Sequence, residues 1–260
     1  MYVLMIGDIV GRAGRRAAKE NIPELCKEFG IDFVIANGEN AAGGNGLTQE
    51  VALELFSYGI DVLTMGNHVW NKKEIFNFIS KETRVIRPAN FPPGVPGQGL
   101  NVFKTRQGEP IGVLNLSGRI FMSDNLDCPF RKADELLKRL QNLARVLVVD
   151  FHAEATSEKI ALSWYLAGRV SAVCGTHTHV QTADERILPG GTAYISDVGM
   201  TGPRDSVIGV KKELAIDKFL TQLPKRFEVA PGLYQFNAAL IEIDEENGEA
   251  KRIERIMNNE

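Results

Sequence analysis

Short runs of apolar and β-branched residues recur along the chain, and each run ends in Gly, Asn, Asp or His. The six clearest are YVLMIGD (2–8), DFVIANGEN (32–40), DVLTMGNH (61–68), RVLVVDFH (145–152), VSAVCGTH (170–177) and TAYISDVG (192–199). Continuous apolar runs of this length are typical of strands that are buried on both faces. Segments with helical spacing lie between them, at about 12–28, 48–57, 71–79, 129–143 and 155–168. This alternation predicts a mostly parallel sheet covered by helices.

Two segments depart from the alternation. Residues 101–118 predict a hairpin that turns at Gln107-Gly108. Residues 233–256 predict a second hairpin, with Asn247-Gly248 at its turn. The hairpins favour an α/β fold with two mixed sheets. No shift in composition divides the chain, so we expect a single domain over residues 1–260.

Polar side chains with chemical potential follow the predicted strands. The sequence has 4 histidines, and every one lies at the end of an apolar run: His68, His152, His177 and His179. Two carboxylates and two amides come directly after runs of their own: Asp8, Glu39, Asn40 and Asn67. Ligands of open α/β sheets bind beyond the carboxyl ends of the strands. Taken singly, each residue also has a structural interpretation, such as a helix cap, an ion pair or a hydrogen-bonded core histidine.

As a set, these eight side chains predict a metal centre. Oxygen and nitrogen donors without thiolate suit iron, manganese or zinc. Eight candidates are more than one tetrahedral zinc ion needs. They suit two metal ions about 3.5–4 Å apart that share a bridging carboxylate, an arrangement found in many phosphatases.

The order of these motifs resembles the calcineurin-like metallophosphoesterases. The signature of that superfamily is GDxH, GD, GNH[DE], a lone His and GHxH, and here it reads GDIV, GEN, GNHV, DFH and GTHTH. The chain departs from it at three positions, where Val10, Glu39 and Val69 replace His, Asp and an acidic residue. The YmdB-like branch of bacterial phosphodiesterases shares these departures. It also resembles this chain at 118–130, 150–159 and 196–209.

The resemblance implies two mixed β-sheets sandwiched between helices (α/β/β/α) and a role for each candidate residue. One metal ion is expected on Asp8, Glu39, Asn40 and His179, and the other on Glu39, Asn67, His152 and His177. His177 and His179 are two residues apart, so on an extended backbone they would share a face. The resemblance also makes His68 the proton donor to the leaving oxygen. Val69 cannot orient that imidazole as an acidic residue would.

The activity that follows is hydrolysis of a phosphodiester by in-line attack of a hydroxide that bridges the metal ions. Iron or manganese is expected, and zinc or magnesium would also fit. The resemblance implies cyclic nucleotides (2′,3′ or 3′,5′) as substrates. Side chains of two loops are candidate substrate contacts: Arg119, Phe121, Met122 and Phe130 in 117–130, and Arg204 and Ser206 in 199–209.

Composition narrows the partners and the compartment. A net charge of −3 argues against a protein that coats nucleic acid. The 3 cysteines include no CxxC pair, so neither a disulfide framework nor a zinc ribbon is indicated. No run approaches the ~20 apolar residues that span a bilayer, and the start lacks the basic region of a signal peptide. We expect a cytoplasmic protein without a membrane partner. An RNA-related partner and a homo-oligomer stay open.

Two alternatives compete with the phosphodiesterase. A dinucleotide-binding oxidoreductase would use Gly11 and Gly14, but a GxGxxG motif that ends at Gly14 needs glycine at position 9, which is Ile9. That alternative also leaves the strand-end histidines unexplained. The second alternative is a metal-binding regulatory or RNA-associated protein without catalysis. The departures at Val10 and Val69 keep this alternative open, and an activity assay separates it from the phosphodiesterase.

Overall fold

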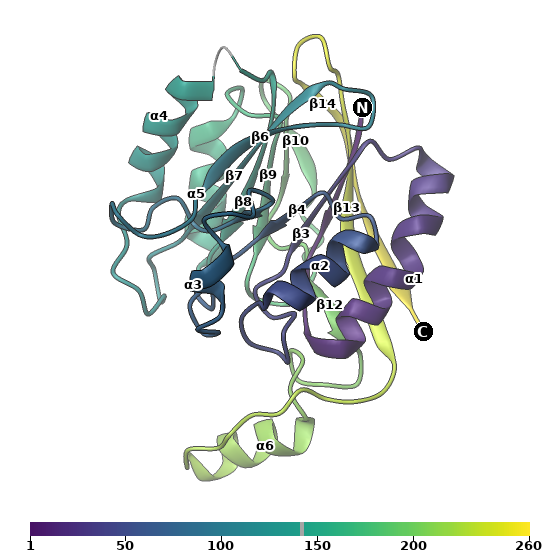
Figure 1. Cartoon of the computed structure of the whole chain (residues 1–260), viewed down its shortest axis with the longest axis vertical. Coiled ribbons are helices and arrows are strands. Elements are labelled where there is room, and N and C mark those ends of the chain that lie inside the picture. The colour runs from purple at the N-terminus through teal and green to yellow at the C-terminus, as the bar shows by residue number, and fades with distance from the viewer. Residues whose placement is uncertain (141–142) are drawn as a thin grey trace.

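Two β-sheets pack face to face between layers of helices (Figure 1). The structure is a computed structural model, and it describes residues 1–140 and 143–260. The helices are α1 (Gly11–Phe29), α2 (Gln49–Ser57), α3 (Ile75–Phe78), α4 (Pro129–Leu140), α5 (Thr156–Leu166) and α6 (Lys212–Thr221). In Figure 1, α1 and α2 cover one outer face, α4 and α5 cover the other, and α6 projects from one end.

The first sheet has 8 strands in the order β2-β12-β13-β1-β3-β4-β5, with β14 beside β13. They are β1 (Tyr2–Ile6), β2 (Asp8–Ile9), β3 (Phe33–Asn37), β4 (Val62–Thr64), β5 (Val85–Ile86), β12 (Met200–Pro203), β13 (Tyr234–Ile243) and β14 (Ala250–Asn259). Strands β1, β3, β4 and β5 run parallel, whereas β13 is antiparallel to β1.

The second sheet has 6 strands in the order β10-β11-β9-β8-β7-β6. They are β6 (Leu100–Lys104), β7 (Pro110–Ser117), β8 (Val146–His152), β9 (Ala172–Thr176), β10 (Arg186–Leu188) and β11 (Thr192–Ile195). Strands β7, β8, β9 and β11 are parallel, and the edge strands are antiparallel to their neighbours. The carboxyl ends of parallel strands in each sheet therefore lie at one edge.

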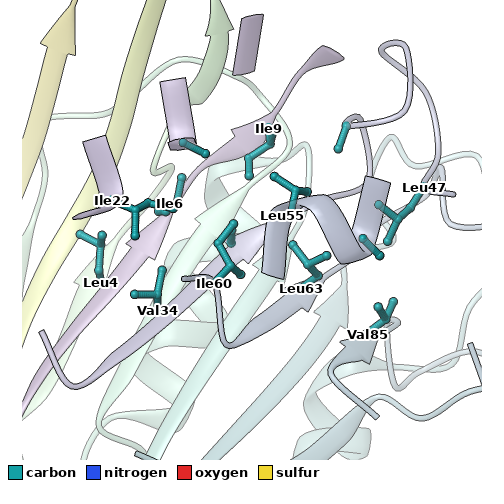
Figure 2. Packing of buried hydrophobic residues seen from close by; sticks show 14 of the residues in the cluster. Leu4, Ile6, Ile9, Ile22, Val34, Leu47, Leu55, Ile60, Leu63 and Val85 are labelled. Carbon is teal, nitrogen blue, oxygen red and sulfur yellow. The ribbon is translucent and has the colours of Figure 1, made fainter. Parts of the chain in front are cut away.

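Alternation along the strands creates separate apolar layers. In β1, Val3 and Met5 face the second sheet, whereas Leu4 and Ile6 belong to the layer under α1 and α2. Figure 2 shows the layer under α1 and α2, with Leu4 and Ile6 close to Ile22 of α1. A third cluster lies between the second sheet and α4 and α5. Strands buried on both faces explain why the sequence shows continuous apolar runs.

The predicted α/β fold with two mixed sheets is confirmed. All six predicted strands form, and both predicted hairpins form as β6–β7 and β13–β14. The helix predicted over 71–79 is wrong in length, because only Ile75–Phe78 is helical. The helix predicted over 129–143 includes residues 141–142, which lie outside the described residues. Five short elements had no prediction: β2, β5, β10, β12 and α6.

Gly14 lets α1 approach the first sheet closely. A Cβ atom at this position would lie 2.3 Å from the carbonyl oxygen of Thr201 in β12. Backbone cannot move aside as a side chain can, so the contact requires glycine. This packing fixes the start of α1 beside β2, which carries Asp8.

Across residues 1–140 and 143–260, no helix combines the length and the apolar character that crossing a bilayer requires.

We expect Gly14→Ala to lower the free energy of unfolding by about 1–3 kcal/mol, as overpacked cores do, despite the higher helix propensity of alanine. Urea unfolding followed by circular dichroism measures this. Lys19→Ala, on the exposed side of the same helix, is the control and should stay within about 0.5 kcal/mol of the wild type. A Gly14→Ala protein as stable as the wild type would contradict the close approach.

Candidate metal centre

The carboxyl ends of five strands converge at one site. The polar residues come from both sheets: Asp8 follows β1, Glu39 and Asn40 follow β3, Asn67 and His68 follow β4, His152 ends β8, and His177 and His179 follow β9. The structure brings all eight predicted residues together in one network of contacts. Asp8, Glu39, Asn40 and His152 are buried within it.

His152 lies at the centre of the network. Its Nε2 atom is 3.0 Å from Oδ1 of Asn67, 3.0 Å from Nδ1 of His177 and 3.1 Å from Oε1 of Glu39. One nitrogen carries at most one proton, so these neighbours cannot all be satisfied by hydrogen bonds from His152. A point where several donor atoms meet in this way fits a metal ion. Glu39, His152 and His177 also form a group whose ligand atoms lie within 4.8 Å of one another.

Contacts behind His152 fix the orientation of its ring. Nδ1 donates to Oγ1 of Thr176 (2.9 Å), and that hydroxyl donates to Oδ1 of Asp150 (2.7 Å). Burial raises the pKa of Asp150 to about 6, so the carboxylate is ionised at neutral pH and accepts. With its Nδ1 proton held by Thr176, His152 can direct the Nε2 lone pair at a metal ion, as metal-ligating histidines do.

Two more of the strand-end histidines, His177 and His179, are held in the same manner. Nδ1 of His179 donates to the carbonyl oxygen of Ile208 (2.9 Å), which leaves Nε2 facing the site. Nε2 of His177 lies 3.1 Å from a carboxylate oxygen of Glu154, which leaves Nδ1 facing His152. Each ring therefore turns a single nitrogen toward the site.

The buried carboxylates call for positive charge. Burial alone would raise the pKa of Asp8, but the imidazole of His179, whose Nε2 lies 3.6 Å from Oδ1, brings the pKa well below its usual range. Burial lowers the pKa of His179, but the carboxylate of Asp8 raises it to about 9. Burial likewise opposes the charged form of His152, yet the charge of Glu39 raises its pKa. The two carboxylates thus favour positive charge in their surroundings, and a metal ion would bring such charge.

Two further observations fit a metal ion. Oδ1 of Asp8 is buried and has no hydrogen-bond partner among the described residues, while Oδ2 accepts from the backbone N–H of His177 (3.1 Å). A Cβ at Gly66 would lie 2.3 Å from Nε2 of His152 and 2.4 Å from Oε2 of Glu39. Glycine therefore keeps open the space in which these two ligands meet.

Because position 69 carries no acidic residue, the side chain of Asn40 orients the imidazole of His68. Oδ1 of Asn40 lies 2.8 Å from Nδ1 of His68, and its Nδ2 lies 3.3 Å from both Oε1 of Glu39 and Nε2 of His179. Val69 instead is buried in the apolar layer. Metal ligation through the Asn40 oxygen requires the amide to turn over, after which Nδ2 faces His68. Amide oxygen and nitrogen are assigned from such networks.

The backbone at His177 and His179 is not extended, so the expectation that they share one strand face is wrong. β9 ends at Thr176, and His177 and His179 adopt positive φ angles of 102° and 67°. The resulting turn directs His177 toward His152 and His179 toward Asp8. Such angles cost about 1–3 kcal/mol each in non-glycine residues and persist where surrounding contacts enforce them.

A pocket of about 260 Å³ opens over the site. It is lined by Glu39, Asn40, His68, Glu154, His177, Thr178, His179 and Ile208. Glu154, Thr178 and Ile208 had no sequence prediction, although Ile208 lies in the 199–209 loop. Their signal is proximity to predicted ligands, since Glu154 and Thr178 are near-neighbours of His152 and His177.

The six candidate substrate contacts do not line this pocket as the described residues define it. Phe130 packs against the apolar layer under α4 and α5, where it meets Tyr165 edge-on. Arg204 contacts the carbonyl oxygen of Glu260. The Ser206 hydroxyl donates to the carbonyl of Pro203 (2.6 Å). Packing of helix α4 accounts for Phe130, and contacts within and beside the 199–209 loop account for Arg204 and Ser206.

The sandwich of two mixed sheets and the cluster of carboxylate, amide and imidazole ligands at its strand ends define a metallophosphoesterase. A family model described as "YmdB-like protein" matches residues 4–256. The chain belongs to this family, as its motifs predicted.

Relatives support the assignment along the whole chain. A 2′,3′-cyclic-nucleotide 2′-phosphodiesterase of Bacillus subtilis is 52% identical over 260 residues, which cover 100% of this chain and 98% of the relative. A crystal structure of a hypothetical protein from Thermus thermophilus superposes with a TM-score of 0.93 at 44% identity and covers 100% of both chains. That of a Mycoplasma pneumoniae phosphatase also gives 0.93, at 35% identity, covering 100% of this chain and 93% of the other. The chain is an enzyme of the phosphodiesterase class, as the sequence predicted.

Gly66→Ala is expected to weaken Mn²⁺ binding by about 10–100-fold, the loss typical when the support of a metal ligand is disturbed. Isothermal titration calorimetry on the metal-free protein measures the affinity. Gly38→Ala is a matched control, because a Cβ there would meet only the flexible side chain of Leu63, at 3.1 Å. Equal Mn²⁺ affinity of the two variants would show that the space at Gly66 does not serve a metal ion.

Proposed function

We propose that the chain hydrolyses 2′,3′-cyclic nucleotides at one ester bond, with two divalent metal ions bound at the strand ends. The substrate follows from the similarity to the Bacillus subtilis enzyme. The observation that carries the proposal is the convergence of eight polar side chains, two of which are the buried carboxylates of Asp8 and Glu39. One carboxylate, Glu39, contacts Asn40 and His68 on one side of the cluster and His152 on the other.

We assign the ligands in two sets that share Glu39. The first set is Asp8, Glu39, Asn40 and His179, and the second is Glu39, Asn67, His152 and His177. Contacts within each set support the assignment: Nε2 of His179 is 3.6 Å from Oδ1 of Asp8, and Nε2 of His152 is within 3.1 Å of its three partners. Oxygen and nitrogen donors without thiolate favour iron or manganese.

Each polar group of the site then has a task. When bound, the two metal ions supply the charge that holds the phosphoryl oxygens and lowers the pKa of the attacking water. Water adds its oxygen to phosphorus as the bond from phosphorus to the 2′ oxygen breaks. His68 protonates that departing oxygen. Its side chain is 36% exposed and lines the pocket, and Asn40 holds Nδ1, so Nε2 is the nitrogen that meets the substrate.

The remaining sequence predictions concern the surroundings of this site. All three cysteines are free thiols, which supports the inference of a reducing compartment such as the cytoplasm. Both sheets contribute ligands, which supports one functional domain over residues 1–260. An RNA-related partner and a homo-oligomer stay predictions.

The proposed function is tested with protein loaded with Mn²⁺ or Fe²⁺. We expect hydrolysis of 2′,3′-cyclic AMP, and slower hydrolysis of 3′,5′-cyclic AMP, in product analysis by chromatography. Loaded protein that hydrolyses neither, and that also leaves bis-p-nitrophenyl phosphate intact, would favour the non-catalytic alternative.

His68→Ala and His152→Ala should separate catalysis from metal binding. His68→Ala is expected to retain both metal ions and to lower kcat by a factor of about 10²–10⁴, as for loss of a general acid. His152→Ala is expected to lose metal and turnover together, because its Nε2 lies at the centre of the ligand network. Elemental analysis beside steady-state kinetics decides this. Loss of metal from His68→Ala would refute its assigned role.

A further inference from the structure

Lys159 and Asp197 form a buried ion pair behind the metal site. Nζ of Lys159 lies 2.7 Å from Oδ2 of Asp197, and their side chains are 2% and 1% exposed. Taking two charges out of water is costly, so a buried pair requires good geometry and additional hydrogen bonds. Neither residue is among the eight candidate ligands, and the proposed reaction gives neither a direct task.

The hydrogen bonds of Asp197 reach the turn at residues 177–179, which carries His177 and His179 and is called the metal-binding turn below. Oδ2 accepts from both the backbone N–H (3.0 Å) and the hydroxyl (2.7 Å) of Thr178. Oδ1 accepts from the N–H of Gly199 (2.8 Å). Asp197 therefore holds Thr178, the residue between His177 and His179, by two hydrogen bonds, while its other carboxylate oxygen is held by Gly199.

The turn needs such a grip because its backbone is unfavourable. His177 and His179 both hold positive φ angles, which non-glycine residues adopt where surrounding contacts enforce them. Thr178 is the hinge between the two angles. Fixing its N–H and its hydroxyl sets the directions in which the neighbouring imidazoles point.

Lys159 anchors the arrangement to α5. Its aliphatic stem passes below the end of β9, where a Cβ on Gly175 would lie 3.1 Å from its Cδ. The ammonium group thus reaches Oδ2 of Asp197, the same oxygen that accepts from Thr178. Without this cation, the buried carboxylate would have only neutral donors.

We propose that Lys159 and Asp197 are positioning residues that hold Thr178 so that His177 and His179 serve different metal ions. The proposal rests on the proposed dinuclear function, which it deepens. Lys159 lies in segment 150–159 and Asp197 in segment 196–209, so the proposal gives each of these segments a positioning role besides its ligand or loop residues.

Glu158 provides a matched comparison on the same helix. Its carboxylate is buried and accepts from the backbone N–H groups of Arg119 and Ile120, each at 3.1 Å. It therefore holds the loop at 118–120 and makes no contact with the metal-binding turn in the described structure. Glu158→Gln disturbs a buried carboxylate of the same helix while it leaves Thr178 and Asp197 in place.

The test measures Mn²⁺ binding to the metal-free protein by calorimetry, with the electron paramagnetic resonance spectrum of the bound ions as a second readout. We expect Asp197→Asn and Lys159→Met to bind Mn²⁺ about 10–100-fold more weakly than the wild type. Both variants should also lose the spectral signal of two magnetically coupled Mn²⁺ ions. Glu158→Gln should bind within threefold of the wild type and keep that signal. A general loss of stability would instead lower the Tm of all three variants, and it would not weaken Mn²⁺ binding selectively in Asp197→Asn and Lys159→Met.

Thr178→Val keeps the test decisive if the charge variants do not fold. It removes only the hydroxyl donor to Asp197, and we expect Mn²⁺ binding about 3–10-fold weaker, toward the lower end of outer-shell effects. Wild-type affinity and an unchanged spectrum in Thr178→Val and in every charge variant that folds would overturn the positioning role. Wild-type protein that binds two ions but cleaves no phosphodiester would refute the proposed function alone. Wild-type protein that binds no Mn²⁺ would refute both.

Discussion

Two carboxylates buried side by side are the constraint on which the rest of the site depends. Asp8 and Glu39 are almost completely shielded from solvent, and a buried charge must be paired. The structure meets this demand with imidazoles from the second sheet, so ligands from both sheets share one site. The proposed metal site therefore depends on the packing of the two sheets, because neither sheet alone carries either proposed ligand set.

Three of the four imidazoles are fixed by partners that are not among the proposed ligands. Thr176, Ile208 and Glu154 each contact the ring nitrogen that faces away from the centre. Glycine clears the space where the ligands meet, and a buried ion pair holds the turn between the last two histidines. Ligand identity and ligand direction are thus encoded by different residues, which lie far apart in the sequence.

Much of this could be read from the sequence, and the limits have physical causes. Strands buried on both faces leave continuous apolar runs, so the strand ends and the polar residues that follow them were predictable. Contacts such as Asn40 with His68, or Lys159 with Asp197, join residues 28 and 38 positions apart and leave no periodic signal. Helix α6 had no prediction: only Ala215 of it is buried, whereas its larger apolar side chains, Ile216, Phe219 and Leu220, are exposed.

The proposed ligands hold two metal ions with Glu39 between them. Anomalous X-ray diffraction from crystals of Mn²⁺-loaded protein would locate these ions. We expect two anomalous peaks about 3.5–4 Å apart, one near Asp8 and His179 and one near His152 and His177, with Glu39 between them. A single peak, or two peaks without Glu39 between them, would contradict this arrangement.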